Sequence, residues 1–221
     1  MKRLLLLILA MLLMLSFAGC TDERKCYDDA PDKPQNLPPT VCAKPVVYLY
    51  PEEETEVEVT LDFDGELTFT YPKYNDGWRV TAQPDGTLTD ERGREYYCLF
   101  WEGEADIEYD MTQGFVVEGS AVRTFLEDAL AKLGLTEREA DEFIIYWLPQ
   151  LENNPYNLIS FQQEAYTDAA VLDIYPEPDC VLRVFMAYKA LETPIDIEPQ
   201  TLEGILRHGF TVVEWGGAQV K

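Results

Sequence analysis

The stretch VEVTLDF at residues 57–63 alternates strictly between apolar and polar side chains. Because successive side chains of a β-strand point to opposite faces, this pattern predicts a strand with one face on a core and the other in water. After Asp64-Gly65 the alternation resumes in ELTFTY at residues 66–71. Two alternating runs around an Asp-Gly pair are typical of a β-hairpin, so we expect these strands to pair with each other.

Neighbouring stretches extend this β-rich region in both directions. KPVVYLYP at 44–51 is rich in β-branched and aromatic residues and stops at a proline, and WRVTA at 78–82 continues the alternation. A short strand is expected near Leu88 between two turn sequences. YYCLFW at 96–101 is apolar at every position, as expected where both faces of a strand are covered. Residues 44–102 are therefore predicted to form an antiparallel meander.

Helical spacing begins beyond the meander. Within residues 122–133 the apolar side chains recur at i, i+3, i+4, i+7 and i+8, and Gly134 follows the last turn. A second helix begins with the capping box of Thr136 and Glu139 and keeps the same spacing until Pro149, which is expected to kink or end it. Each of these two amphipathic helices buries one face, most simply against the sheet.

The remaining chain returns mainly to strands, expected at 158–161, 171–175, 181–188 and 210–215, with a short helix at 200–208. Strands followed by helices and then by strands predict an α+β fold. Its parts are an N-terminal antiparallel β meander or sandwich-like sheet, two amphipathic helices, and further antiparallel strands.

The first residues of the chain have the layout of an export signal. Lys2 and Arg3 precede the apolar run LLLLILAMLLML at 4–15, and SFAGC at 16–20 supplies small residues. A membrane-spanning helix needs about 20 apolar residues, so a cleaved signal is favoured over a permanent anchor helix. The ending resembles the lipobox of bacterial lipoproteins, which implies that Cys20 is diacylated and becomes the mature N-terminus. Two acyl chains give stable anchoring.

These features divide the chain into three parts. Residues 1–19 form the predicted signal peptide, and 20–43, rich in proline and polar residues, form a predicted tether. Residues 44–217 form a single α+β body, β-rich over 44–118 and α+β over 119–217. We expect the tether to hold this body at the membrane on the extracytoplasmic side of a bacterial cell envelope.

Several segments of the body together resemble an uncharacterised family of bacterial exported proteins and lipoproteins with related fungal sequences. They include KPVVYLYP at 44–51, LFWE at 99–102, FIIYWLP at 143–149 and VEWGG at 213–217. In the first segment the family has isoleucine where this chain has Val47. The resemblance covers nearly the whole body and implies a shared fold unit, but it transfers no catalytic residue.

The charge of the chain excludes one large class of partners. It has 17 basic and 41 acidic residues, a formal net charge of -24. Such a surface repels nucleic acids, whose phosphates need clusters of lysine and arginine. An anionic lipid surface would repel it as well, so contact with the membrane is expected to run through the lipid on Cys20.

Four cysteines follow Cys20, an even number in a chain expected to be exported, where disulfides can form. Three pairings are possible. We favour Cys26 with Cys42, because the segment between them is short, and Cys98 with Cys180, because both lie on predicted strands. Two separately buried thiols are the alternative for the second pair. Neither a C-x-x-C pair nor a second histidine is present, so we expect no metal site and no cofactor.

One carboxylate is a candidate catalytic residue. Glu102 follows Trp101 at the end of an apolar strand, and a carboxylate beside an aromatic ring suits glycan hydrolysis. A glycosidase needs a second acid about 5 to 10 Å away, which the sequence does not identify. The structural alternative is a solvated residue that opens a turn before Gly103.

Aromatic residues are the better indication of binding. Tyr50, Trp78, Trp101 and Trp215 are candidates for rings that stack on sugars or grip a peptide, with burial in the core as the alternative. The sequence therefore predicts a lipid-anchored envelope protein that binds a protein, a glycan or a small ligand. An exported hydrolase that acts on glycans through its carboxylates is the alternative.

Overall fold

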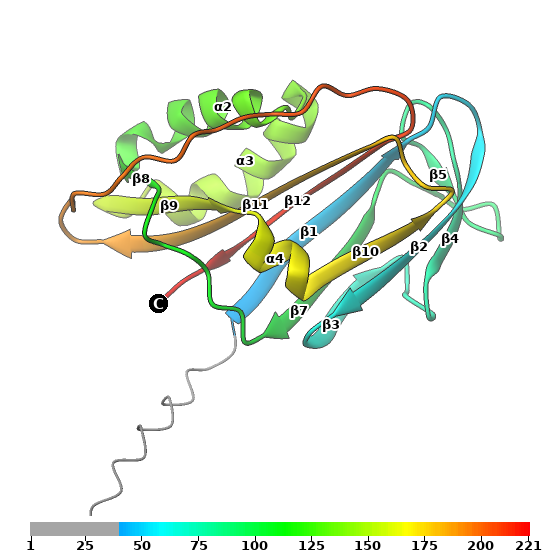
Figure 1. Cartoon of the computed structure of the whole chain (residues 1–221), viewed down its shortest axis with the longest axis horizontal. Helices are drawn as coiled ribbons and strands as arrows, with labels where there is room; N and C mark the ends of the chain where they lie inside the picture. The colour runs from blue at the N-terminus through cyan, green and yellow to red at the C-terminus, as the bar shows by residue number, and fades with distance from the viewer. Residues whose placement is uncertain (1–39) are drawn as a thin grey trace, which may run out of the picture. The chain divides into compact units, whose positions relative to one another are not determined.

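Two β-sheets and two helices form three layers in the computed structural model, which describes residues 40–221 (Figure 1). The larger sheet contains, in spatial order, β3 (Glu66–Tyr71), β7 (Leu99–Ala105), β1 (Thr40–Tyr50), β12 (Thr211–Gln219), β11 (Cys180–Leu191), β9 (Tyr156–Gln162) and β8 (Phe115–Glu118). The smaller sheet contains β10 (Ala170–Tyr175), β2 (Thr55–Phe63), β4 (Trp78–Ala82), β5 (Leu88–Thr89) and β6 (Glu95–Tyr96). Helices α2 (Val122–Leu133) and α3 (Glu137–Leu151) cover the larger sheet, and the short α4 (Glu164–Ala169) precedes β10. The fold is α+β, as the sequence predicts.

The larger sheet has a hydrophobic core on each face. Tyr48 and Trp215 face the helices and pack with Phe143 of α3. Leu49 enters the other core, between the two sheets, with Val59 of the smaller sheet. Successive residues of β1 therefore enter opposite cores, which explains why KPVVYLYP is apolar at nearly every position.

The two alternating runs around Asp64-Gly65 do not pair with each other, so the predicted hairpin is wrong. β2 pairs with β10 and β4 in the smaller sheet, and β3 pairs with β7 in the larger one. The turn carries the chain from one sheet to the other, and Gly65 packs so closely that an added Cβ would lie 2.8 Å from the Cβ of Ala105. Alternation reports which face of a strand is buried, and it leaves the partner strand undetermined.

The run YYCLFW also changes sheets. Its first part belongs to β6 in the smaller sheet, and β7 begins at Leu99 in the larger sheet. The predicted meander over 44–102 is therefore two sheets of a sandwich. The first strand also begins earlier than expected, because Thr40 pairs with Ala105 inside the stretch predicted as tether.

The C-terminus of α2 and the N-terminus of α3 lie where the sequence predicts them. Gly134 follows α2 with a left-handed φ of 94°, and its N–H bonds the carbonyl of Ala131. Thr136 and Glu139 form the capping box of α3, in which the backbone N–H of Thr136 donates to Glu139 over 2.8 Å. Pro149 lies in the last turn, and α3 ends at Leu151.

The predicted helix at 200–208 does not form. These residues belong to an irregular strap, residues 192–210, that connects β11 to its parallel neighbour β12 and passes along α2 (Figure 1). This parallel pair also departs from the expectation that the later strands are antiparallel. Apolar spacing at 202, 205 and 206 suggested a helix, but only Leu202 packs against a core, and Leu206 is 87% exposed.

Side chains of the strap bind the backbone of neighbouring elements, which explains its extended path. The amide of Gln200 accepts from the N–H of Phe161 over 2.8 Å and donates to its carbonyl over 3.0 Å. Arg207 donates to the carbonyl of Gly134 over 2.7 Å. Gly204 lies against the end of α2, where an added Cβ would approach the carbonyl oxygen of Lys132 to 2.6 Å. A helical turn would withdraw these groups from their partners.

We predict that Gly217→Ala destabilises the body by about 1–3 kcal/mol, the range for overpacking of a core. A Cβ at Gly217 would lie 2.6 Å from the carbonyl oxygen of Met186 and 2.7 Å from the ring of Trp147. Urea unfolding measures the loss, with Ala131→Ser on the exposed side of α2 as a control that changes stability by less than about 0.5 kcal/mol. Equal unfolding midpoints for Gly217→Ala and the unsubstituted protein would contradict this packing.

Candidate functional site

Three of the aromatic residues expected to contact a ligand are buried. Trp78 is 2% exposed, and Trp101 and Trp215 are fully buried. Their indole N–H groups donate inside the protein, that of Trp101 to Glu214 over 3.2 Å and that of Trp215 to the hydroxyl of Tyr48 over 3.1 Å. These three predictions are wrong, because a ring closed inside a core cannot stack on a ligand.

The fourth predicted residue, Tyr50, lines a cleft of about 480 Å³ at the end of β1. All three layers contribute to this cleft: β1, the turn at 84–87 from the smaller sheet, the first turn of α3, and the end of the strap. Its walls are made by Tyr48, Tyr50, Pro84, Asp85, Gly86, Thr87, Tyr97, Thr136, Arg138, Glu139, Arg207, Gly209 and Thr211.

A bidentate ion pair forms one wall of the cleft. The guanidinium of Arg207 donates to both oxygens of Glu139, over 2.6 and 3.0 Å, and also to the carbonyl of Gly134. Glu139 is 1% exposed. The pair therefore ties the strap to the turn between α2 and α3, and both of its charges are neutralised within the protein.

Burial and the ion pair together determine the protonation states of Glu139 and Tyr50. Burial alone would raise the pKa of Glu139, but hydrogen bonds from Arg207 and Thr136 outweigh it, so the pKa is lowered. Burial and the neighbouring Glu139 carboxylate raise the pKa of Tyr50. At neutral pH Glu139 is therefore ionised and Tyr50 keeps its hydroxyl proton.

The floor of the cleft consists of two parallel tyrosine rings. The rings of Tyr48 and Tyr50 stand two residues apart on β1, with centroids 6.2 Å apart and an interplanar angle of 7°. The hydroxyl of Tyr48 donates to Glu142 over 2.8 Å. Because Tyr48 is 4% exposed, Tyr50 presents most of this aromatic surface to the cleft.

Groups of opposite charge occupy the rim. Asp85 accepts from the N–H of Thr87 over 2.9 Å, and its pKa is lowered by hydrogen bonds from Thr87 and, less strongly, by the charge of Arg138. The side chain of Arg138 is 81% exposed. Tyr97 is 54% exposed, and its partial burial together with the neighbouring Cys98 thiol and the Glu142 carboxylate raises its pKa to about 12. The rim therefore offers a guanidinium donor, a carboxylate acceptor and an open phenol ring.

Glu102, the candidate catalytic residue, does not line the cleft. It lies in β7 opposite Phe69 of β3 and is partly buried. Burial and then the charge of Glu102 raise the pKa of Tyr146 on α3, which places the carboxylate near that ring. Among the described residues, no group of three or more His, Cys, Asp or Glu side chains is placed to hold a metal ion.

The predicted bridge between Cys98 and Cys180 is wrong. Both thiols are free and buried, which is the alternative that the sequence left open. Strands β1 and β12 separate β7, which follows Cys98, from β11, which begins at Cys180. Three strand spacings of about 4.8 Å exceed the span of a disulfide. Burial raises the pKa of the Cys98 thiol to about 12, so this thiol is protonated at neutral pH.

The other cysteine predictions concern the start of the chain. Cys20 and Cys26 lie outside the described residues, so the lipid on Cys20 and the bridge from Cys26 to Cys42 stay predictions. Cys42 is fully buried in β1. In the part of the chain that the structure describes, no helix is long and apolar enough to span a membrane.

Comparison with known proteins gives a partial match to a protein from Butyrivibrio fibrisolvens that bears the name "Uncharacterized protein in bglA 3'region". The two are 50% identical over 64 residues, which make up 28% of this chain and 66% of that protein. The chain thus covers slightly less than two thirds of the relative's length. No family model matches the chain. No solved structure matches it either.

Of the residues that line the cleft, the sequence predicts Tyr50 as a ligand-binding side chain and none of the charged ones. Asp85, Arg138 and Arg207 come from three segments far apart in the chain, and no local pattern connects them. The capping box did mark Glu139, but as the start of a helix. The turn sequence at 84–86 is the remaining signal for the position of the cleft, since a turn between strands exposes its side chains at the end of a sheet.

We predict that the ion pair of Glu139 with Arg207 makes stability depend on pH. Because the folded-state pKa of Glu139 is lowered, its stabilisation is present above the unfolded pKa of about 4.3 and is lost as the pH falls through the folded value. Glu139→Gln should therefore cost about 3 kcal/mol near pH 7, since it leaves Arg207 without its charge partner. The difference should shrink at acid pH.

Urea unfolding of both proteins between neutral pH and about pH 3 measures this difference. Asp141→Asn, at an exposed position of the same helix, is the control and should track the unsubstituted protein at every pH. A gap between Glu139→Gln and the unsubstituted protein that stays constant with pH would contradict the assignment.

Proposed function

We propose that this chain is a bacterial lipoprotein, anchored through Cys20 on the extracytoplasmic side of the membrane, whose cleft binds a neutral saccharide. The observation that carries the binding proposal is the rim, where Arg138 and Asp85 line the same cleft as the exposed ring of Tyr97. The sequence of residues 1–20, with its export-signal layout and its small residues before Cys20, supports the proposed anchoring.

The chemistry of the rim suits a hydroxyl group. A sugar hydroxyl both accepts and donates hydrogen bonds, so it can accept from the guanidinium of Arg138 while it donates to the carboxylate of Asp85. The aromatic rings of Tyr50 and Tyr97 offer an apolar surface for the carbon face of a sugar ring. The volume of about 480 Å³ falls within the usual range for small-molecule sites.

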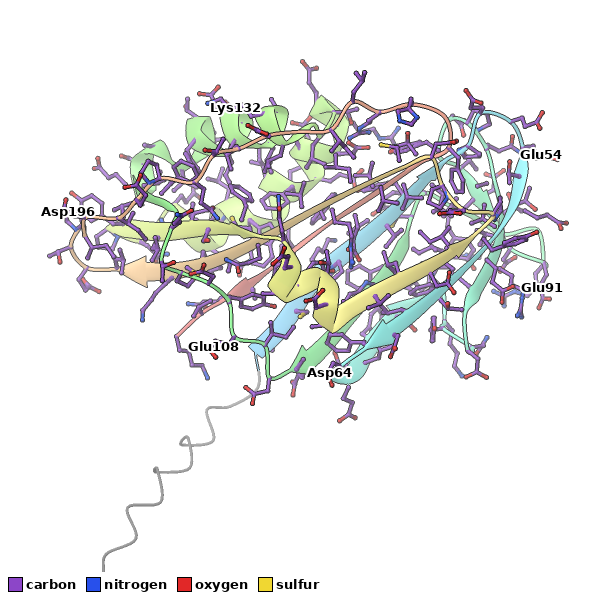
Figure 2. All side chains as sticks on the ribbon, viewed as in Figure 1. Glu54, Asp64, Glu91, Glu108, Lys132 and Asp196 are labelled. Atoms are coloured by element: carbon purple, nitrogen blue, oxygen red, sulfur yellow. The ribbon has the colours of Figure 1, made fainter. Side chains whose placement is uncertain are left out.

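Charge argues for a neutral ligand. Acidic residues lie exposed around the body, and Figure 2 shows Glu54, Asp64, Glu91, Glu108 and Asp196 at its periphery. With a net charge of -24, the protein repels anions as they approach. In the cleft Arg207 is already paired with Glu139, which leaves Arg138 as the cation available to an anion, and the carboxylate of Asp85 in the same lining repels one. An anionic ligand is therefore disfavoured.

The anchoring proposal predicts that Cys20→Ser moves the protein from the membrane fraction to the soluble extracytoplasmic fraction. Loss of the acylated cysteine removes both acyl chains, which supply stable membrane attachment. Cell fractionation and intact-mass measurement of the unsubstituted protein check this, with Cys98→Ser as the control that stays in the membrane. An unmodified thiol at Cys20 in the mature protein would contradict the proposal.

The binding proposal predicts that Tyr97→Ala and Arg138→Ala each weaken saccharide binding by about tenfold, since each removes one rim contact. Calorimetric titration of the full chain, in a detergent without a sugar headgroup, against a panel of neutral oligosaccharides measures the affinities. Tyr175→Ala, which removes a ring 77% exposed outside the cleft, and Arg123→Ala on α2 are the matched controls.

Two results would contradict the binding proposal. One is a panel in which no saccharide binds, and the other is unchanged affinity in both rim variants. The alternative function, glycan hydrolysis through Glu102, predicts instead that the panel is cleaved. Mass spectrometry of the incubated saccharides, with Glu102→Gln for comparison, separates a binder from a hydrolase.

A further inference from the structure

A second group of aromatic side chains lies outside the cleft, on the face of β3 and β7 beside α3. Phe69 is 53% exposed, and its ring meets that of Phe100 edge to face with centroids 5.8 Å apart. The ammonium of Lys44 lies 5.4 Å from the centroid of Phe100 and 5.4 Å from that of Tyr146. We call Phe69, Phe100, Tyr146 and Lys44 the aromatic patch.

One face of α3 leads from the cleft to the aromatic patch. Arg138, Glu142 and Tyr146 follow one another at intervals of four residues, which places them in a row along the helix. Arg138 belongs to the rim of the cleft, and its guanidinium lies 4.0 Å from Glu142. Tyr146 belongs to the patch, so the row joins the two places without a break.

On the strand side, Tyr97 at the rim stands three residues before Phe100 of the patch, and Cys98 between them is buried. The accessible connection between the cleft and the patch is therefore the row on α3.

We propose that the cleft is one end of a longer track and that the protein binds a linear neutral glycan chain along it, with the aromatic patch as a second subsite. This inference rests on the proposed binding of a saccharide in the cleft. Both ends of the track have the same chemistry. The cleft combines tyrosine rings with Arg138 and Asp85, and the patch combines its rings with Lys44 and with Glu102, which pairs with Phe69 across β3 and β7.

Affinity should then grow with chain length. Once one end of a chain occupies the cleft, the sugar units that follow are held at high effective concentration beside the patch. Each ring that a sugar covers adds apolar contact at little conformational cost, because the protein side is already packed. Arg138 and Tyr146 are separated by about 12 Å of helix, and Phe69 lies beyond α3 on β3, so an extended oligosaccharide is needed to reach both subsites.

The test compares β-1,4-linked oligomers of glucose and of N-acetylglucosamine, each as a disaccharide and as a hexasaccharide, by calorimetric titration of the full chain. We expect the hexasaccharide of a series that binds to bind at least about tenfold more tightly than its disaccharide. Phe69→Ala should remove this gain and leave disaccharide binding unchanged, because Phe69 does not line the cleft. Phe69→Tyr keeps a ring and should keep the gain.

Ile145→Ala, which removes an apolar side chain 74% exposed on α3 and outside the row, is the control for general surface effects. Equal affinity for short and long oligomers, or a gain that survives Phe69→Ala, would overturn the track and leave the cleft as an isolated site. If no oligomer of either series binds at either length, the proposed function and the track fail together.

Discussion

A charge pair buried between the two sheets fixes how the central strands meet. The carboxylate of Glu214 has no exposure, and it accepts from the guanidinium of Arg183 over 2.6 Å and from the indole of Trp101 over 3.2 Å. A buried charge without partners is strongly destabilising, so these three groups must come together. Since Glu214 and Arg183 face each other in the parallel pair of β12 and β11, and Trp101 comes from β7, the contact specifies strand neighbours and faces.

The position of the cleft follows from this arrangement. Because helices cover one face of the larger sheet and the smaller sheet covers the other, side chains in the middle of β1, β11 and β12 are committed to the two cores. Side chains become available at the ends of the strands and on β3, the edge strand of the larger sheet. Tyr50, the last residue of β1, stands at one such end, and the exposed ring of Phe69 stands on the edge strand.

Sequence patterns predicted most elements but few of their neighbours. Period-two alternation located β2 and β3, yet it could not show that the turn at Asp64-Gly65 separates two sheets, because alternation depends on burial and not on pairing. Apolar spacing predicted a helix in the strap, where Arg207 instead binds Glu139. Of the predicted ligand-binding rings, Tyr50 lines the cleft. All four tryptophans are buried, which the sequence could not show, because a tryptophan on a strand can face either a core or a ligand.

Hydrogen–deuterium exchange of the full chain, with and without a saturating oligosaccharide that binds, locates the ligand site on the three-layer body. Binding in the cleft and along the track should slow exchange in the turn at 84–87, around Tyr97, and along the first half of α3. Protection confined to β10 or to residues 195–202, with the cleft unchanged, would place the ligand elsewhere and overturn the proposed site.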